Sequence, residues 1–279
     1  MAELHRINRR LFLSDVGRRT VAIAVLGPGV LAACSSDGEL TLETPSNEPT
    51  TTSTAASTTS TETSEAEVTT STLSSPSAED VPPALAWQRV VLGGVSAYVL
   101  ARGDEVTIVD TGRSGSAPQI EEALMTLGAD WSHVGRVILT HLHSDHIGGL
   151  PGILEETATA TVHAGRADVE AITASREVQA LDDGDEIFGL QIIATPGHTP
   201  GHIAVLDPAA GLLVAGDALN ESDGMVLGPN PSFTPDMNTA NASVQRLAER
   251  SFETVVFGHG NPIEGGASDA VVALAQTLS

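Results

Sequence analysis

The strongest constraint on this chain is the run His141-Leu142-His143-Ser144-Asp145-His146. Four of its six side chains can ligate a transition metal, and core packing does not select for so many imidazoles in so short a stretch. The five residues before it, 136–140, are mostly apolar and β-branched and end in a threonine suited to a turn, which predicts a buried strand. The pattern therefore predicts a cluster of metal ligands at the end of a strand.

Charge and cysteine content narrow the partners and the ligand types. The chain has 13 arginines and no lysine against 36 acidic residues, which gives a formal net charge of −23. So acidic a surface repels phosphates and anionic headgroups, so we expect no nucleic-acid partner and a small-molecule substrate instead. A single cysteine permits neither an intrachain disulfide nor a cysteine-rich zinc site, so a bound metal must use histidine and carboxylate ligands.

The first 34 residues have the features of an export signal. Residues 8–13 (Asn-Arg-Arg-Leu-Phe-Leu) resemble the twin-arginine pattern, and residues 20–33 form an apolar run too short for a comfortable membrane span. The run ends Leu31-Ala32-Ala33-Cys34, which resembles the lipobox of bacterial lipoproteins, so we predict a lipidated Cys34 and an anchor on the outer face of the cytoplasmic membrane. The alternative is a plain N-terminal anchor helix with a chance cysteine.

Residues 35–84 are rich in serine, threonine and proline and have no hydrophobic periodicity, which predicts a disordered linker. We place the folded domain at 85–279. Strands are predicted at 87–91, 96–100, 105–109, 134–139, 160–162, 186–193, 203–206, 212–215 and 254–257, and helices at 118–127, 149–155, 167–173, 236–249 and 267–278. Strands in two groups, each followed by helices, predict an α/β domain of two packed sheets with helices outside.

Three downstream segments add further candidate ligands, each at a strand end or in a glycine-bounded loop. They are 196–202 (Pro-Gly-His-Thr-Pro-Gly-His), 214–217 (Val-Ala-Gly-Asp) and 257–260 (Phe-Gly-His-Gly). Glycine beside a ligand lets the backbone approach a metal closely. Each segment alone is weak evidence, because a Gly-Asp pair is more often only a turn and His202 is more often a supporting or loop residue. With the first run they give seven candidates: His141, His143, Asp145, His146, His198, Asp217 and His259.

The series HLHSDH, PGHTPGH, AGD and GHG, in that order, resembles the metallo-β-lactamase superfamily, and residues 110–112 (Asp-Thr-Gly) match its usual first motif. The resemblance covers residues 85–279 and implies an αββα sandwich with two mixed β-sheets and the site at one edge between them. It also implies that Asp110 supports the ligands and that Asp217 bridges two metals. The remaining ligands would divide into His141, His143 and His198 for the first metal and Asp145, His146 and His259 for the second.

This ligand set implies hydrolytic chemistry. Two divalent ions roughly 3.5–4 Å apart can share a bound water that loses a proton near neutral pH and becomes a hydroxide. We expect the hydroxide to attack the carbonyl of an ester, thioester or lactone, with Asp145 as the catalytic residue that orients it and passes its proton to the leaving group. Two zinc ions per chain are expected, although histidine and carboxylate ligands also admit iron or manganese.

The sequence leaves the substrate open. The ligand set is similar to that of glyoxalase II, but that group carries basic residues in a C-terminal extension, and residues 260–279 contain no arginine or lysine. Asp217 argues against a β-lactamase, and Tyr98, the only tyrosine, lies in an early predicted strand rather than beside the metals as in the lactonases. Three alternatives to the hydrolase are a mono-iron sulfur dioxygenase, a β-lactamase and a non-catalytic metal-binding lipoprotein.

Residues 221–233 follow Asp217 directly and are expected to overhang the site. Met225, Leu227 and Phe233 would give it an apolar wall, or would instead cap the core. No cluster of basic residues lies nearby, which favours an uncharged or weakly charged substrate over a polyanion.

Overall fold

The computed structural model describes residues 83–278. The predicted export signal, the predicted lipidation site Cys34 and all but the end of the predicted linker fall on residues 1–82, which lie outside the described residues. Within 83–278, no helix combines the length and the apolar character that a membrane span requires.

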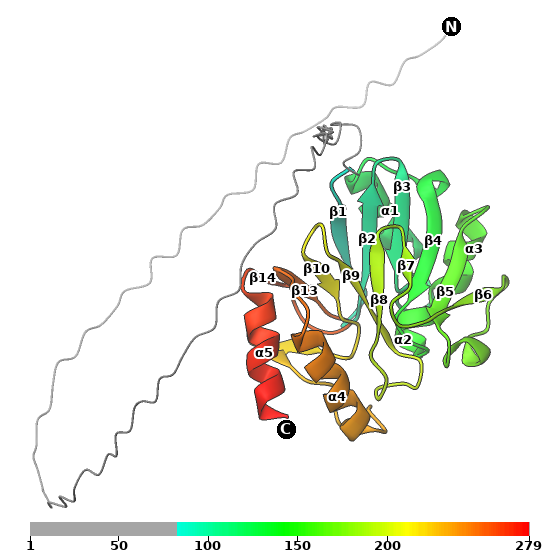
Figure 1. The fold of residues 1–279 in the computed structure, drawn as a ribbon. Helices are drawn as coiled ribbons and strands as arrows, with labels where there is room; N and C mark the ends of the chain where they lie inside the picture. Colours follow the sequence, from blue (N-terminus) through cyan, green and yellow to red (C-terminus); the bar gives the residue numbers. More distant parts are fainter. Residues whose placement is uncertain (1–82, 279) are drawn as a thin grey trace, which may run out of the picture. The chain divides into compact units, whose positions relative to one another are not determined.

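The first sheet has six strands in the order of the sequence (Figure 1). Its first three strands form an antiparallel meander and its last three run parallel to β3. Gly93, Gly94 and Gly103 have positive φ in the two turns of the meander, a conformation that costs glycine little. The strands are β1 (Ala86–Val91), β2 (Ser96–Arg102), β3 (Glu105–Val109), β4 (Val134–Leu139), β5 (Thr161–Gly165) and β6 (Val178–Leu181).

The second sheet has the order β14-β13-β10-β9-β8-β7 and is antiparallel except for the parallel pair β10 and β13. A separate hairpin of two short strands, β11 and β12, follows β10. The bounds are β7 (Glu186–Ile187), β8 (Leu190–Ala194), β9 (Ile203–Asp207), β10 (Leu212–Val214), β11 (Asn220–Ser222), β12 (Met225–Leu227), β13 (Thr254–Val256) and β14 (Ile263–Glu264).

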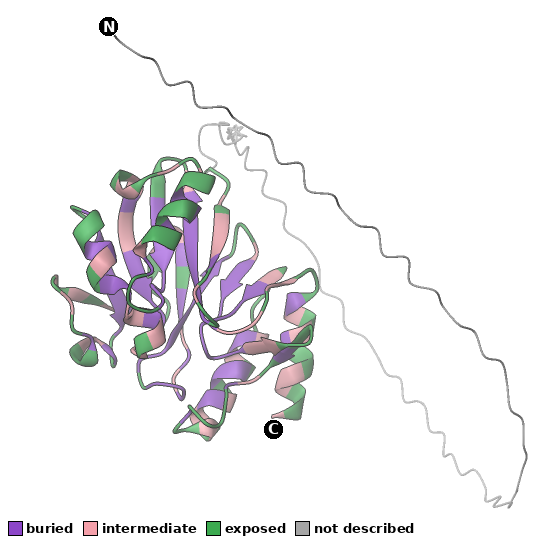
Figure 2. Ribbon diagram, turned by 180° about the vertical axis from the view of Figure 1, so that it is seen from behind, coloured by how far each residue is buried: buried purple, intermediate pink, exposed green. Residues whose placement is uncertain are grey.

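Alternating side chains assign each sheet face to a different core, as the two-residue period of a strand requires. In β2, Tyr98 and Leu100 lie in the core between the sheets, while Val99 packs against helices α1 (Ala117–Thr126) and α3 (Leu150–Glu156). In β9, Val205 enters the core between the sheets, while Ala204 packs toward helices α4 (Met237–Ala248) and α5 (Ala267–Thr277). Strands are mostly buried and the outer helix faces exposed (Figure 2). The predicted αββα sandwich is confirmed.

The predicted elements differ from the structure in three places. The helix expected at 167–173 is wrong: only a short 3₁₀ turn, Val169–Ala171, forms there, because the buried side chain of Asp168 accepts hydrogen bonds from two other loops. The strand expected at 186–193 is instead the hairpin β7–β8, whose turn residues Phe188 and Gly189 both have positive φ. The short strands β6, β11, β12 and β14 were not predicted.

Candidate metal centre

The ligand run leaves the end of β4 and enters the short helix α2 (Ser144–Ile147). Hydrogen bonds tie this helix to the loop after β3. The backbone N–H of Thr111 and its hydroxyl donate to the carbonyl oxygen of His146 at 2.7 and 2.8 Å, and Gly149 N donates to Gly112 O at 2.9 Å. A Cβ on Gly149 would lie 2.2 Å from the carbonyl oxygen of Thr111, so the two segments meet only because this residue is glycine. The ligand run is therefore held rigidly.

Three histidines, His141, His143 and His198, form the first cluster. Nδ1 of His143 lies 3.0 Å from Nε2 of His141 and 2.9 Å from Nε2 of His198. Nitrogen ligands about 2.0–2.1 Å from one zinc ion are themselves roughly 2.9–3.4 Å apart. The spacing of the three nitrogens therefore fits one metal ion.

Threonine side chains orient the two buried rings of the first cluster. The Thr140 hydroxyl donates to Oδ2 of Asp110 at 2.8 Å, so it accepts from Nδ1–H of His141 at 3.0 Å. On the other side, Nδ1 of His198 lies 3.1 Å from the Thr234 hydroxyl. Partners of this kind fix the tautomer and leave Nε2 free for a metal.

Burial also keeps these two rings neutral. It lowers the pKa of His141 well below its usual value and the pKa of His198 to about 4, although the Asp217 carboxylate partly offsets the shift of His198. Neutral imidazole is the form that binds metals. The first cluster is therefore ready to bind a cation near neutral pH.

The second cluster, Asp145, His146 and His259, is of mixed type and more open. His146 donates from Nδ1–H to Oδ2 of Asp110 at 2.8 Å, and His259 donates from Nδ1–H to the carbonyl oxygen of Gly94 at 2.7 Å. Nε2 of His259 lies 3.6 Å from Oδ2 of Asp145, and these two side chains are 37% and 28% exposed. Both histidines thus direct Nε2 inward, and the cluster faces solvent.

Asp217 lies between the clusters. Its Oδ2 is 3.3 Å from Nε2 of His198 and 3.4 Å from Nε2 of His259, and its Oδ1 is 3.3 Å from Nε2 of His146. One carboxylate thus contacts a histidine of the first cluster and two of the second. The structure brings together all seven side chains predicted from the sequence, and Asp110 supports them as expected.

His202 positions Asp217 without joining either cluster. Its Nε2 accepts the backbone N–H of Asp217 at 3.0 Å, and its Nδ1–H donates to the Thr195 hydroxyl at 2.7 Å. The ring stacks on His141 with centroids 5.1 Å apart. Burial lowers the pKa of His202 to about 3, so the ring stays neutral and Nε2 remains an acceptor.

Two buried atoms indicate that the site is built for cations. Nε2 of His146 and Oδ1 of Asp217 are inaccessible to solvent and have no hydrogen-bond partner among the described residues, because their 3.3 Å contact lacks hydrogen-bond geometry. Burying such atoms unpaired is costly, whereas a metal ion would satisfy both. The residues present therefore fit a metal centre.

Without metal, the second cluster holds a proton. Burial would lower the pKa of His146, but the carboxylates of Asp110 and Asp217 raise it to about 10. Burial would raise the pKa of Asp217, but the neighbouring imidazoles of His146 and His259 hold it well below its usual value. The Asp217 carboxylate, 3.4 Å from Nε2 of His259, likewise raises the pKa of that histidine.

Backbone geometry brings the strand ends close to the ligands. A Cβ on Gly258 would lie 2.0 Å from Oδ1 of Asp217 and 2.6 Å from Cε1 of His146, so any side chain at Gly258 would displace both. Asp110 has φ of +60°, a region rarely occupied by residues other than glycine, asparagine and aspartate. Strained residues of this kind persist where surrounding contacts determine them, and here the Asp110 carboxylate accepts from Thr140 and His146.

A cleft of about 570 Å³ opens over the two clusters. Phe233 lines it as predicted, but Met225 and Leu227 do not. Those two residues lie on the β11–β12 hairpin, where Met225 faces a crevice beside α5, so the expected apolar wall is reduced to one aromatic ring. The lining residues are Arg113, His143, Ser144, Asp145, His198, Asp217, Asn220, Asn230, Phe233 and His259.

Sequence reasoning missed several residues of the site. Arg113, Asn220 and Asn230 line the cleft, and Arg113 could have been noticed because it follows the Asp-Thr-Gly motif directly. No motif in the sequence marked Asp168 as part of the site. Its buried carboxylate accepts from Leu142 N at 3.1 Å, Gly201 N at 2.7 Å and the Thr199 hydroxyl at 2.6 Å, and so ties two ligand-bearing loops together.

Curated relatives share most of this domain. The chain is 31% identical over 196 residues to "Uncharacterized protein YobT" and 34% identical over 202 residues to "Probable metallo-hydrolase YflN", both of Bacillus subtilis. The matches cover 60% and 57% of this chain and 83% and 76% of those proteins. A hydroxyacylglutathione hydrolase of Aeromonas hydrophila is 30% identical, with 57% of this chain and 58% of that protein covered.

Solved structures show the same fold. A metallo-beta-lactamase family protein of Thermus thermophilus matches 69% of this chain and 78% of its own, with 25% identity and a TM-score of 0.55. TTHA1623 in a di-iron-bound form matches 66% of this chain and 98% of its own, with 26% identity and a TM-score of 0.54. The family model of the metallo-beta-lactamase superfamily matches residues 90–259, from β1 to His259. The chain therefore belongs to the metallo-beta-lactamase superfamily and is a metal-dependent hydrolase.

Proposed function

We propose that this protein is a dinuclear hydrolase that cleaves an ester, thioester or lactone bond of a small molecule at the cell surface. The observation that carries the proposal is Asp217, whose carboxylate contacts His198 of the first cluster and both His146 and His259 of the second. Two relatives support the bond type. One is the hydroxyacylglutathione hydrolase, and the other is an "Atrochrysone carboxyl ACP thioesterase" of Pseudocercospora fijiensis, 28% identical, of whose length the match covers 50%.

In this proposal the first cluster would hold one divalent cation, the second cluster would hold another, and Asp217 would be a ligand to both. When bound, the cations supply an activated water near neutral pH and polarise the carbonyl under attack. Zinc suits the all-histidine and carboxylate donor set, and iron or manganese are the alternatives, since one neighbouring structure was solved with two irons.

The side chains around the cleft supply the rest of the mechanism. Asp145 is partly exposed in the lining of the cleft, where its carboxylate can take a proton from the attacking water and return it to the leaving group. Asn230 uses its Oδ1 to accept Ser232 N, which leaves its amide N–H groups free for the substrate. The ring of Phe233 offers an apolar surface for the group next to the scissile bond.

The proposal places the enzyme outside the cytoplasm, folded and loaded with metal before export and anchored through lipidated Cys34. Replacing Arg9 and Arg10 by lysine should stop export of active protein, and Cys34→Ala should release the exported enzyme from the membrane fraction. Active protein on the outer face in the double lysine variant would contradict the export route.

Metal analysis and a substrate panel test the chemistry. About two zinc ions per chain and turnover of a lactone or thioester are expected, on a panel that also holds phosphoesters and β-lactams. His143→Ala should abolish turnover, while His133→Ala, a partly exposed histidine of a 3₁₀ turn away from the cleft, should not. One iron per chain with oxygen consumption would identify a sulfur dioxygenase, and turnover confined to β-lactams would identify a β-lactamase. Protein without metal and without turnover would end the enzyme proposal.

A further inference from the structure

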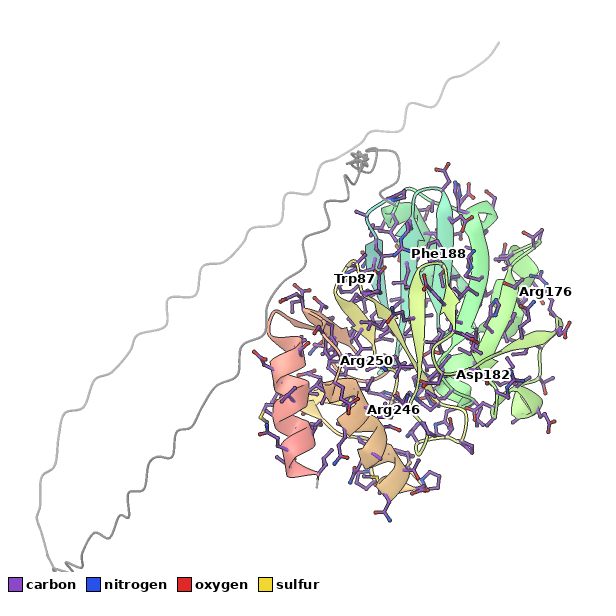
Figure 3. The ribbon with its side chains drawn as sticks, viewed as in Figure 1. Trp87, Arg176, Asp182, Phe188, Arg246 and Arg250 are labelled. Carbon is purple, nitrogen blue, oxygen red and sulfur yellow. The ribbon has the colours of Figure 1, made fainter. Side chains whose placement is uncertain are left out.

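The arginines of the described domain differ in how they are used. Six of the eight between residues 83 and 278 donate side-chain hydrogen bonds to other described residues: Arg89, Arg102, Arg136, Arg166, Arg176 and Arg246. Arg113 and Arg250 donate none to any described residue. Arg250 lies just beyond the end of α4 (Figure 3), whereas Arg113 lines the cleft above the metal clusters.

The backbone of Arg113 is fixed even though its side chain is exposed. It follows Gly112, whose carbonyl oxygen accepts Gly149 N at 2.9 Å and whose backbone forms a parallel bridge to Ile147 of α2. A Cβ on Gly148 would come within 3.3 Å of the Cα of Arg113, so the two segments are in contact. The guanidinium group therefore projects from an anchor beside the short helix that carries Asp145 and His146.

An arginine without a partner is notable in this domain. Residues 83–279 contain eight arginines and 25 carboxylates, so nearby carboxylates are abundant, yet Arg113 pairs with none among the described residues. Its five donors match a carboxylate in a bidentate arrangement that a lysine cannot provide. A free guanidinium in the lining of a substrate cleft is available for a ligand. The side chain also borders a smaller hollow beside Leu92 and Gly93, so the test below must show that its ligand lies in the cleft.

We propose that Arg113 binds a carboxylate of the substrate, so that the preferred substrate is an ester, thioester or lactone that bears one carboxylate within reach of Arg113. The inference rests on the proposed hydrolase function. The free amide of Asn230 on the same cleft supplies a second donor to that group or to the neighbouring oxygen. One arginine suits a single carboxylate and not a polyanion. The sequence predicted an uncharged or weakly charged substrate, and this proposal specifies one with a single negative charge.

The carboxylate takes no part in the bond changes. Water adds its oxygen to the carbonyl carbon, the bond to the alkoxy or thiolate group breaks, and that group leaves with a proton from the water. The products are an acid and an alcohol or thiol, or a single hydroxy acid when the substrate is a lactone, and the carboxylate held by Arg113 is unchanged. Arg113 is thus a specificity-determining residue whose effect appears in discrimination between substrates.

The test compares 4-acetoxybenzoate with its neutral isostere 4-acetoxybenzamide, using zinc-loaded protein. The wild type should prefer the anion in kcat/KM. Arg113→Gln should lower the ratio of anion to amide about 10- to 100-fold, the effect of losing hydrogen bonds to a charged group. Arg113→Lys should restore part of the ratio, and Arg250→Gln, which removes the same charge away from the cleft, should leave it as in the wild type.

Calorimetry decides the proposal without turnover. The ligands 4-hydroxybenzoate and 4-hydroxybenzamide should show the same preference for the anion and the same loss in Arg113→Gln. His143 lines the cleft, so His143→Ala should also weaken binding of the anion if the ligand lies there. A ratio in Arg113→Gln equal to the wild type, in either measurement, overturns the proposal. If the wild type hydrolyses neither ester but calorimetry shows the Arg113-dependent preference, the hydrolase proposal fails for aryl acetates and the carboxylate site stands.

Discussion

The two ligand clusters lie side by side but are built differently. The first is all imidazole, with Nδ1 of His143 2.9–3.0 Å from the other two nitrogens and two of its rings buried and neutral. The second mixes a carboxylate with imidazoles, has contacts of 3.3–3.6 Å to its neighbours and includes a histidine with a raised pKa. The two buried rings of the first cluster can accept a cation without releasing a proton, whereas the second cluster must first deprotonate His146. We therefore expect the first to fill first and to bind more tightly.

The largest expected effect comes from breaking the first cluster. His143→Ala removes the nitrogen that lies within 3.0 Å of both other histidines, so the tight zinc-binding phase should disappear. Loss of kcat/KM should be roughly a thousandfold or more, because activation of water depends on the metal. Zinc titration and kinetics of the same preparation measure both, with His133→Ala as the matched control. A tight zinc phase that survives in His143→Ala would contradict the ranking of the clusters.

Breaking the second cluster should be less severe. His259→Ala removes a partly exposed ligand and leaves the first cluster intact, so about one zinc per chain should remain bound. We expect kcat/KM to fall about a hundredfold, since one metal still polarises the carbonyl. The measurement is metal content after dialysis, paired with kinetics. Loss of both zinc ions would show that the clusters bind cooperatively and not in sequence.

Asp110→Asn tests how far the second cluster depends on the hydrogen bond that orients His146. An amide cannot accept from His146 Nδ1–H and keep the remaining contacts of Asp110 with Thr140, so His146 loses its fixed orientation. Zinc affinity of the second cluster should fall about 10- to 100-fold, as for other residues that support a ligand. Asp269→Asn, an exposed change in the first turn of α5, is the control. Equal weakening of both zinc phases would show that Thr140 carries the effect to His141.

The smallest effect is on pH dependence. The folded pKa of His146, about 10, exceeds the unfolded value near 6.5, so its contribution to apoprotein stability is full below pH 6.5 and is lost as pH rises through about 10. The contribution of His198, whose folded pKa is about 4, has the opposite pH dependence. It lowers the stability of the apoprotein as pH drops from 6.5 toward 4. The Tm of chelated protein should therefore be highest near pH 6.5–7.

Zinc affinity provides a second pH measurement. The affinity of the second cluster should rise about tenfold per pH unit between 7 and 9, because one proton leaves His146 for each cation bound. The affinity of the first cluster should stay constant there. An equal slope for both phases would refute the proposed difference in protonation.

Much of the fold was predictable because its strands are long enough to show a pattern. The ranges of β3 and β4 match the structure residue for residue, and the amphipathic face of α4 is buried at Ala240, Val244 and Leu247 as expected. The strands β11 and β14 have two or three residues and include polar ones, so no periodicity marks them. Their pairing depends on partners distant in sequence.

The residues of the site also divide into those that the sequence predicts and those that it does not. The seven candidate ligands were identifiable because their residue types and motifs are distinctive. The residues that hold them in place were not, because a side chain such as Asp168 acts on backbone groups 26 and 33 positions away. Arg113 is intermediate: its charge is visible in the sequence, but its lack of a partner among the described residues appears only in three dimensions.

Gly258 illustrates a different kind of constraint. It offers no donor, acceptor or charge to the metal centre, yet the space beside it is already filled by Asp217 and His146. Every amino-acid replacement reachable from a glycine codon by one base change adds at least a methyl group, so no single-step missense mutation at this position is sterically neutral. In a saturation mutagenesis screen, Gly258 should be as intolerant as a histidine ligand, and a residue with no side chain would be scored as essential for catalysis.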